Sequence, residues 1–165
     1  MYFYNAVKKM VKQFTAVNEF INTDKKKKTE MKKLFSTKYS AGAFSAALLL
    51  LRLALGILMM HHGYQKLMHF SDMQGKFMNF MGLGTTVSLA LVVFAEFFCS
   101  MFLILGLFTR LAAIPLIIAT AVMIVKAHSG EVFGDGEMAA LYFTGYVVLL
   151  LVGPGRVSVD SMIGK

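Results

Sequence analysis

The sequence predicts an all-α integral membrane protein, a four-transmembrane-helix bundle preceded by an amphipathic basic N-terminal segment. Three observations lead to this fold class. The 165 residues are 57% hydrophobic and only 16% charged, whereas soluble domains carry about a quarter charged residues. Four long apolar blocks follow one another after the first forty residues, and most of the net charge of +8 lies in front of them.

Residues 1–43 are predicted to form a basic cytoplasmic tail and linker, with ten lysines against three acidic residues. Within residues 2–21 the apolar side chains recur every three or four positions, and the lysines lie off that stripe. Such a helix would rest on anionic lipid headgroups, pack against a partner protein or be only weakly ordered. The lysine run at 25–28 is typical of a solvated linker. Lysines beside a first membrane helix follow the positive-inside rule, so we expect no nucleic-acid partner.

Residues 44–160 are predicted to form the membrane domain, since a bilayer core of about 30 Å needs about 20 helical residues. The third and fourth apolar blocks are shorter than this. Polar flanking residues such as Lys126, His128 and Glu137 must therefore extend these two spans, with their polar ends reaching to the membrane surface. The four blocks are Ala41–Met68, about 87–108 with an interruption at Glu96, Leu111–His128 and Met138–Val152.

The connections between the blocks predict the topology. Arg110, Arg156 and Lys165 would share a side with the lysine tail, which makes both termini cytoplasmic. The connection at 69–86 spaces its phenylalanines and methionines helically and predicts a short interfacial helix at the outer end of the bundle. The connection at 105–112 is so short that it predicts a tight antiparallel hairpin.

The first block carries charges that hydrocarbon disfavours by at least about 2.5 kcal/mol each. At 100° per residue, one face of this helix collects the residues Arg52, Gly56, Met59, Gly63, Lys66 and Phe70. His62 borders the face, and His61 points almost the opposite way. Glycines on a shared face favour close helix packing.

Depth along the helices predicts that Arg52 pairs with Glu96 of the second block. The rise of about 1.5 Å per residue places both groups at neighbouring depths within reach of the arginine side chain. Such a pair would either form the polar floor of a binding site or only hold the helices in register.

A second polar cluster is expected at the outer mouth of the bundle, from His62, Lys66, His128 and Glu137. Histidines beside a carboxylate could relay protons or hydrogen-bond a quinone carbonyl, while simple interfacial anchoring is the alternative. We expect no metal site, because there is no HExxH-like spacing. Cys99 is the only cysteine and predicts a packing role.

Five segments resemble the DoxX family of small bacterial membrane proteins. They are Arg52-x-x-x-Gly56, the stretch 62–67 (HGYQKL), Glu96, the stretch 105–110 (LGLFTR) and the stretch 153–160 (GPGRVSVD). The resemblance covers roughly 44–160 and implies a four-helix domain in the cytoplasmic (inner) membrane. It also implies association with membrane oxidoreduction, because founding members look like subunits of a thiosulfate:quinone oxidoreductase.

Three functions are therefore considered, in decreasing order of expectation. One is a subunit or partner of a membrane oxidoreductase system that binds a quinone or lipid-like molecule in the bundle, in which case quinone is the expected cofactor. Another is a non-enzymatic scaffold or assembly factor, and a small-molecule transporter is a third choice. The expected partners are the bilayer, a redox enzyme subunit or a second copy of the chain. No residue is assigned a catalytic role, and whether the chain is an enzyme stays open.

Overall fold

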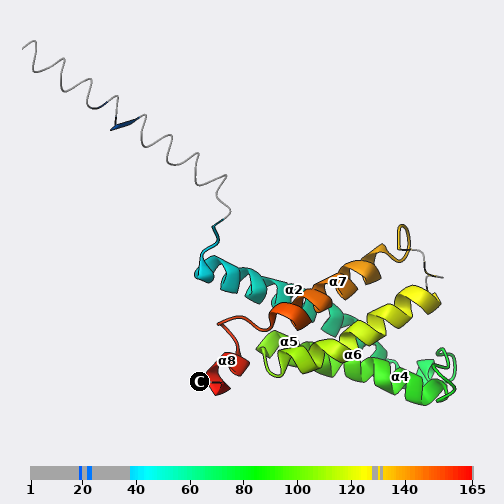
Figure 1. Ribbon diagram of the computed structural model, residues 1–165. Helices are drawn as coiled ribbons and strands as arrows, with labels where there is room; N and C mark the ends of the chain where they lie inside the picture. Colours follow the sequence, from blue (N-terminus) through cyan, green and yellow to red (C-terminus); the bar gives the residue numbers. More distant parts are fainter. Residues whose placement is uncertain (1–18, 20–21, 24–37, 128–129, 131, 165) are drawn as a thin grey trace, which may run out of the picture. The chain divides into compact units, whose positions relative to one another are not determined.

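The computed structural model describes residues 19, 22–23, 38–127, 130 and 132–164 of the chain (Figure 1). The chain divides into two compact units, Met1–Ser40 and Ala41–Lys165. The predicted amphipathic helix at 2–21 and the lysine linker lie almost entirely outside the described residues. The second unit carries the features described below.

The second unit is helical wherever the structure describes it, apart from the connections, and α2 matches the first predicted block from end to end. The helices are α2 (Ala41–Met68), α3 (Phe70–Met73), α4 (Thr85–Val93), η1 (Phe94–Cys99), α5 (Ser100–Leu105), α6 (Thr109–Val122), η2 (Met123–Ala127), α7 (Glu137–Val152) and α8 (Val159–Ile163).

The second block is one helical run from α4 to α5, and its middle turn, η1, is a π-helix that contains Glu96. A π turn inserts an extra residue into an α-helix and is frequent at functional sites. The apolar pattern of the block showed an interruption at Glu96 but not this change of helix type. Both flanking pieces, α4 and α5, remain α-helical.

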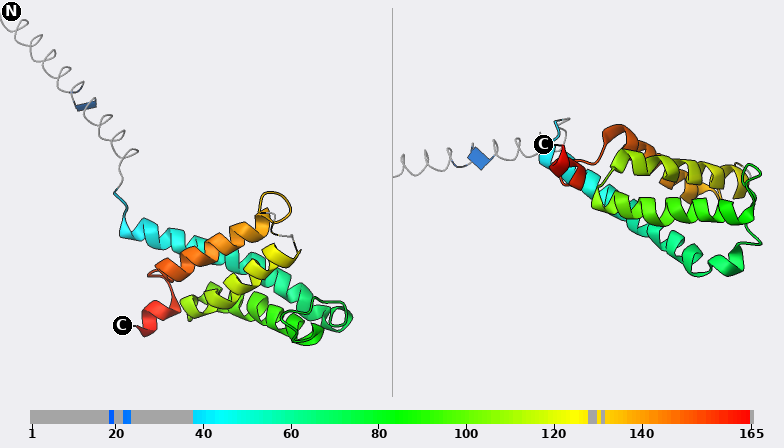
Figure 2. Two further views of the ribbon diagram at one scale, coloured as in Figure 1. Left: turned by 45° about the vertical axis from the view of Figure 1, so that its right-hand side comes forward. Right: turned by 90° about the horizontal axis from the view of Figure 1, so that it is seen from below.

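The four long helical segments pack in a ring that follows the chain (Figures 1 and 2). The α4–α5 run lies against both α2 and α6, α6 lies along α7, and α7 closes the ring against α2. The predicted hairpin is confirmed, because α5 ends at Leu105 and α6 begins at Thr109. Gly106 and Phe108 turn the chain there with positive φ angles of 70° and 49°.

Glycines let α2 approach its neighbours closely, as its predicted face requires. The buried residues of α2 are Ser45, Leu48, Arg52, Gly56, Met59 and Gly63. A Cβ atom at Gly63 would lie 2.5 Å from the backbone nitrogen of Phe97, and one at Gly56 would lie 2.6 Å from Ile104. Only a residue without a side chain fits at Gly63, because the obstacle there is backbone.

The outside of the bundle is apolar, as expected of helices that face lipid rather than water. Leu50 of α2, Leu111 of α6 and Leu151 of α7 are all more than 60% exposed. By length and composition, three helical runs within the described residues can cross a membrane: 41–68, 85–105 and 109–127. The fourth apolar helix, α7, has 16 residues.

The connection at 69–86 differs from the interfacial helix predicted for it. A single helical turn, α3, covers Phe70–Met73, and the chain then continues through turns to Thr85. Glycines interrupt this stretch, and Gly82 and Gly84 adopt positive φ angles of 79° and 89°. Helical spacing of aromatic residues was therefore a misleading signal here, because part of this segment instead covers a cavity described below.

Candidate ligand site between the second and third membrane helices

Glu96 forms an ion pair with Lys66, whose Nζ donates to Oε2 at 2.6 Å. The carboxylate is 1% exposed and the lysine side chain 20% exposed. Lys66 lies one turn after Gly63, the glycine that touches the backbone of Glu96 and Phe97. Close contact between α2 and the π turn therefore brings the ammonium group to the carboxylate.

The predicted Arg52–Glu96 pair is wrong. Arg52 instead donates from Nη1 to the carbonyl oxygen of Pro154 at 3.0 Å and from Nη2 to that of Val157 at 2.7 Å. Arg52 and Lys66 share a face of α2 but lie about 21 Å apart along its axis. One carboxylate cannot serve both, and Lys66 is the residue level with Glu96.

Arg52 belongs to a second polar centre, which joins the end of the chain to the α5–α6 hairpin. Beyond the end of α7 the backbone carbonyls have no helical partners, and Arg52 supplies donors to two of them. Asp160 of α8 accepts hydrogen bonds from the backbone N–H groups of Phe108 at 2.6 Å and Thr109 at 2.9 Å. The carboxylate thus caps the N-terminus of α6. Arg52 is buried, as predicted, but its hydrogen bonds hold the segment after α7 in place and do not belong to the cavity.

Burial raises the pKa of Asp160, but backbone hydrogen bonds from Thr109 and Phe108 and the charge of Arg52 outweigh it. The net result is a pKa below the ordinary value. The carboxylate is therefore held in its charged form at the end of the bundle.

A cavity of about 280 Å³ borders the Lys66–Glu96 pair. Its other walls are apolar: Phe77, Met78, Val92, Ala119, Val122, Met123 and Ala127. A second hollow of about 300 Å³ shares Phe77, Met78, Val92, Ala119 and Val122 with the first. The two are neighbouring parts of one apolar space between α4–η1 and α6, with the ion pair at one end.

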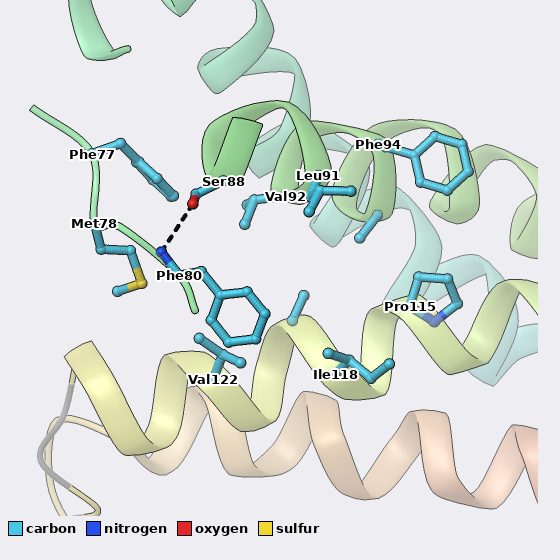
Figure 3. Close-up of a pocket in the computed structure, with 12 residues that line it drawn as sticks. Phe77, Met78, Phe80, Ser88, Leu91, Val92, Phe94, Pro115, Ile118 and Val122 are labelled. Atoms are coloured by element: carbon cyan, nitrogen blue, oxygen red, sulfur yellow. Dashed lines mark hydrogen bonds between the residues drawn. The ribbon is translucent and has the colours of Figure 1, made fainter. Parts of the chain in front are cut away.

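Figure 3 shows how the apolar part of this space is built. Leu91 and Val92 lie on one side, and Ile118 and Val122 of α6 lie on the other. Phe77, Met78 and Phe80 of the connecting segment cover one end. A hydrogen bond of 2.9 Å from the Phe80 backbone nitrogen to Oγ of Ser88 holds the segment in place.

The apolar space reaches the outside of the bundle. Leu91, Phe94 and Ile118 line it, yet each is about half exposed on the outer surface. Because this surface is apolar, a lipid-soluble molecule could enter sideways from the bilayer without crossing water. Ser88 is the polar residue of this part, and its hydroxyl donates to the carbonyl of Gly84 at 2.6 Å.

The predicted outer-mouth cluster is only partly assembled. Lys66 belongs to the ion pair, whereas His62 is exposed, and its ring packs edge-on at 6.5 Å from that of Tyr142. Glu137 is exposed at the start of α7, and His128 lies outside the described residues. Among the residues that the structure describes, no group of His, Cys, Asp or Glu side chains could hold a metal ion.

Sequence reasoning missed two kinds of residue: a carboxylate that caps a helix and apolar residues that line the cavity. Asp160 lies inside the stretch 153–160 that carried the family resemblance, but nothing in that stretch indicated its partner. Val92 and Ala119 line the space beside the ion pair, and they look like any other residues of an apolar helix. Helical phase relative to Glu96 could have pointed to Val92, which lies one turn earlier.

The fold defines a class, that of small all-helical, multi-pass membrane proteins with buried ionisable groups between the helices. The chain belongs to the DoxX family: the model of that family matches residues 47–129. The matched region contains Arg52, the Lys66–Glu96 pair and the cavity, and it ends before α7. No curated protein and no solved structure matches the chain.

Proposed function

We propose that this DoxX-family protein binds a quinone or a similar lipid-like molecule within its bundle and serves as a subunit or partner of a membrane oxidoreductase. The observation that carries the proposal is the apolar space that opens toward lipid and ends at the Lys66–Glu96 pair. Pockets for such ligands are mostly apolar, with a few polar groups that fix the orientation. An isoprenoid chain suits the apolar walls, and a polar ring suits the charged end.

The membrane arrangement that goes with this function has α7 as a fourth span and both termini in the cytoplasm of a bacterium. The 16 residues of α7 are just short of the usual range of about 17–25, which local thinning or flanking residues can offset. The N-terminal lysines would then contact anionic headgroups of the inner leaflet. The redox partner would be an enzyme subunit, or a second copy of this chain would complete the assembly.

Occlusion of the cavity tests the ligand proposal. Short-tailed ubiquinone, oxidised and reduced, should each be added to purified protein and the thermal midpoint measured. Ligand that binds only the folded state raises the midpoint, by a few degrees near saturation. Ala119→Phe should abolish the shift because Ala119 lines both parts of the cavity. Ala54→Phe, an exposed alanine of α2, is the matched control and should retain it.

A midpoint that neither form of the ligand changes in the unmodified protein would overturn the proposal. An unchanged shift in Ala119→Phe would do so as well, because the ligand would then lie elsewhere. Either outcome leaves the family membership and the fold untouched.

A non-enzymatic scaffold is the second candidate, and the lysine-rich sequence of residues 1–43, with ten lysines against three acidic residues, favours it. In that case the basic unit would dock a partner while the bundle serves as its anchor. Deleting residues 1–40 should then abolish partner recovery in a pull-down while the thermal midpoint of the bundle stays unchanged. Full partner recovery without the unit would contradict this candidate.

A further inference from the structure

The two oxygens of Glu96 differ in their surroundings. Oε2 accepts a hydrogen bond from Nζ of Lys66. Oε1 is buried and has no hydrogen-bond partner among the described residues. A buried acceptor without a partner is disfavoured, more so when it is charged, so such an atom in a native protein calls for an explanation.

The surroundings of Glu96 limit what can reach Oε1. Apart from Lys66 and Glu96 itself, the residues that line this part of the cavity have apolar side chains. An ionised carboxylate only accepts hydrogen bonds, and an ammonium group only donates them. A group placed between them gains most when it donates to Oε1 and accepts from Lys66. A hydroxyl group does both, whereas a ketone or quinone carbonyl can only accept.

The cavity beside Glu96 also limits the rest of the ligand. The cavity of about 280 Å³ that Glu96 borders continues into the apolar hollow of about 300 Å³. If the polar head group of a ligand lies at Glu96, its hydrocarbon tail would therefore lie between Val92 and Ala119 and point toward the lipid-facing opening at Phe94. The geometry suits an amphiphile with one polar end and a chain of moderate length.

We infer that the site recognises a hydroxyl-headed amphiphile, and that it prefers this ligand to the same molecule with a carbonyl in place of the hydroxyl. Unpartnered Oε1 of Glu96 is the acceptor that selects the hydroxyl, and Lys66 orients the head from the other side. This inference rests on the proposed function, because it names the chemistry of the same site. For a redox ligand it means that the reduced, hydroxyl-bearing form binds more tightly than the oxidised form.

Two isosteric pairs of ligands test the preference on the unmodified full-length protein in detergent. The first is a 4-alkylcyclohexanol and the matching 4-alkylcyclohexanone, which differ in the donor and have no reversible redox chemistry. The second is a short-tailed ubiquinol and its quinone, compared without oxygen. A hydrogen bond to a charged acceptor predicts at least about tenfold tighter binding of the hydroxyl member, measured by calorimetry or by the midpoint shift. If the hydroxyl member binds more tightly in both pairs, the site accepts aliphatic and aromatic hydroxyl groups alike. If it does so in one pair alone, that pair shows which kind of hydroxyl group the site recognises.

Glu96→Gln makes a prediction that loss of stability alone cannot imitate. Lys66 can only donate, so the amide oxygen would face it and the amide nitrogen would take the place of Oε1. A donor then replaces the acceptor, and the preference for the hydroxyl should be lost, because a hydroxyl and a carbonyl can both accept from an amide N–H. Glu137→Gln, an exposed carboxylate at the start of α7, is the matched control and should keep the preference for the hydroxyl.

Equal affinity for both members of each pair in the unmodified protein would overturn the inference while leaving the proposed function intact. Tighter binding of the carbonyl members would overturn it in the same way. If none of the four ligands binds, the inference and the proposed function both fail. The comparison in the unmodified protein decides the matter even if Glu96→Gln does not fold.

Discussion

Nζ of Lys66 lies 2.6 Å from Oε2 of Glu96, and this ion pair joins α2 to the π turn across thirty positions of the chain. The pair is the polar end of an otherwise apolar cavity, so we expect both stability and the proposed ligand binding to depend on it. Its neutral replacements separate these two contributions.

Lys66→Met should destabilise the bundle strongly, because it leaves the buried carboxylate of Glu96 without its counter-charge. Removal of one partner of a buried pair costs about 3–5 kcal/mol. The double variant Lys66→Met with Glu96→Met should recover much of that loss, since no buried charge remains. Thermal unfolding in detergent measures both, with the exposed Lys76→Met as control. A double variant no more stable than Lys66→Met alone would contradict this account.

Gly63→Ala should be the most damaging of three matched glycine substitutions. Its new Cβ would meet backbone, 2.5 Å from the nitrogen of Phe97, whereas a Cβ at Gly145 would meet the flexible end of Leu55. A Cβ at Gly75 meets nothing within 4 Å. Overpacking costs about 1–3 kcal/mol and more where nothing can yield. The unfolding midpoint should therefore be highest for Gly75→Ala, lower for Gly145→Ala and lowest for Gly63→Ala. If the midpoint of Gly63→Ala is not the lowest, the contact at Gly63 is not tight.

Arg52→Lys should loosen the end of the chain despite conserving the charge. A lysine has a single ammonium group and cannot reproduce the two fixed N–H directions that meet Pro154 and Val157. Each hydrogen bond from a charged donor contributes about 1.5–3 kcal/mol. Limited proteolysis of residues 153–164 should therefore accelerate. Arg110→Lys is the control, because Arg110 makes one long contact of 3.4 Å with Leu151, and equal acceleration in both variants would refute the assignment.

Asp160 should make the stability of the bundle fall in acid. Its folded-state pKa lies below the ordinary value, so its stabilising effect is complete above that value, about 3.9, and is lost as the pH falls through the folded-state pKa. Asp160→Ala should cost about 1 kcal/mol at neutral pH through loss of the helix cap and should flatten the acid limb of the midpoint–pH curve. Asp72→Asn, an exposed carboxylate in α3, should leave that limb unchanged. An acid limb that persists in Asp160→Ala would assign it to another group.

Much of the fold follows from local pattern. The apolar stretch 41–68 is a single helix, and its glycine-bearing face is the buried one, because helical phase depends only on position along the chain. The hairpin at 105–109 follows from length alone. By contrast, the connection at 69–86 has a helical pattern but forms only the four residues of α3, and its Phe77 and Phe80 line the cavity instead.

The sequence by itself therefore determined that this is a helical membrane protein of the DoxX family. It also identified Arg52, Lys66 and Glu96 as charged residues within membrane helices, which hydrocarbon disfavours. Only the tertiary structure decided the partners of these residues: Glu96 pairs with Lys66, and Arg52 donates hydrogen bonds to backbone carbonyls beyond α7. The physical reason is that pairing depends on how neighbouring helices slide and rotate against each other. Contact between Gly63 and the π turn sets that register, and a π turn cannot be read from apolar periodicity.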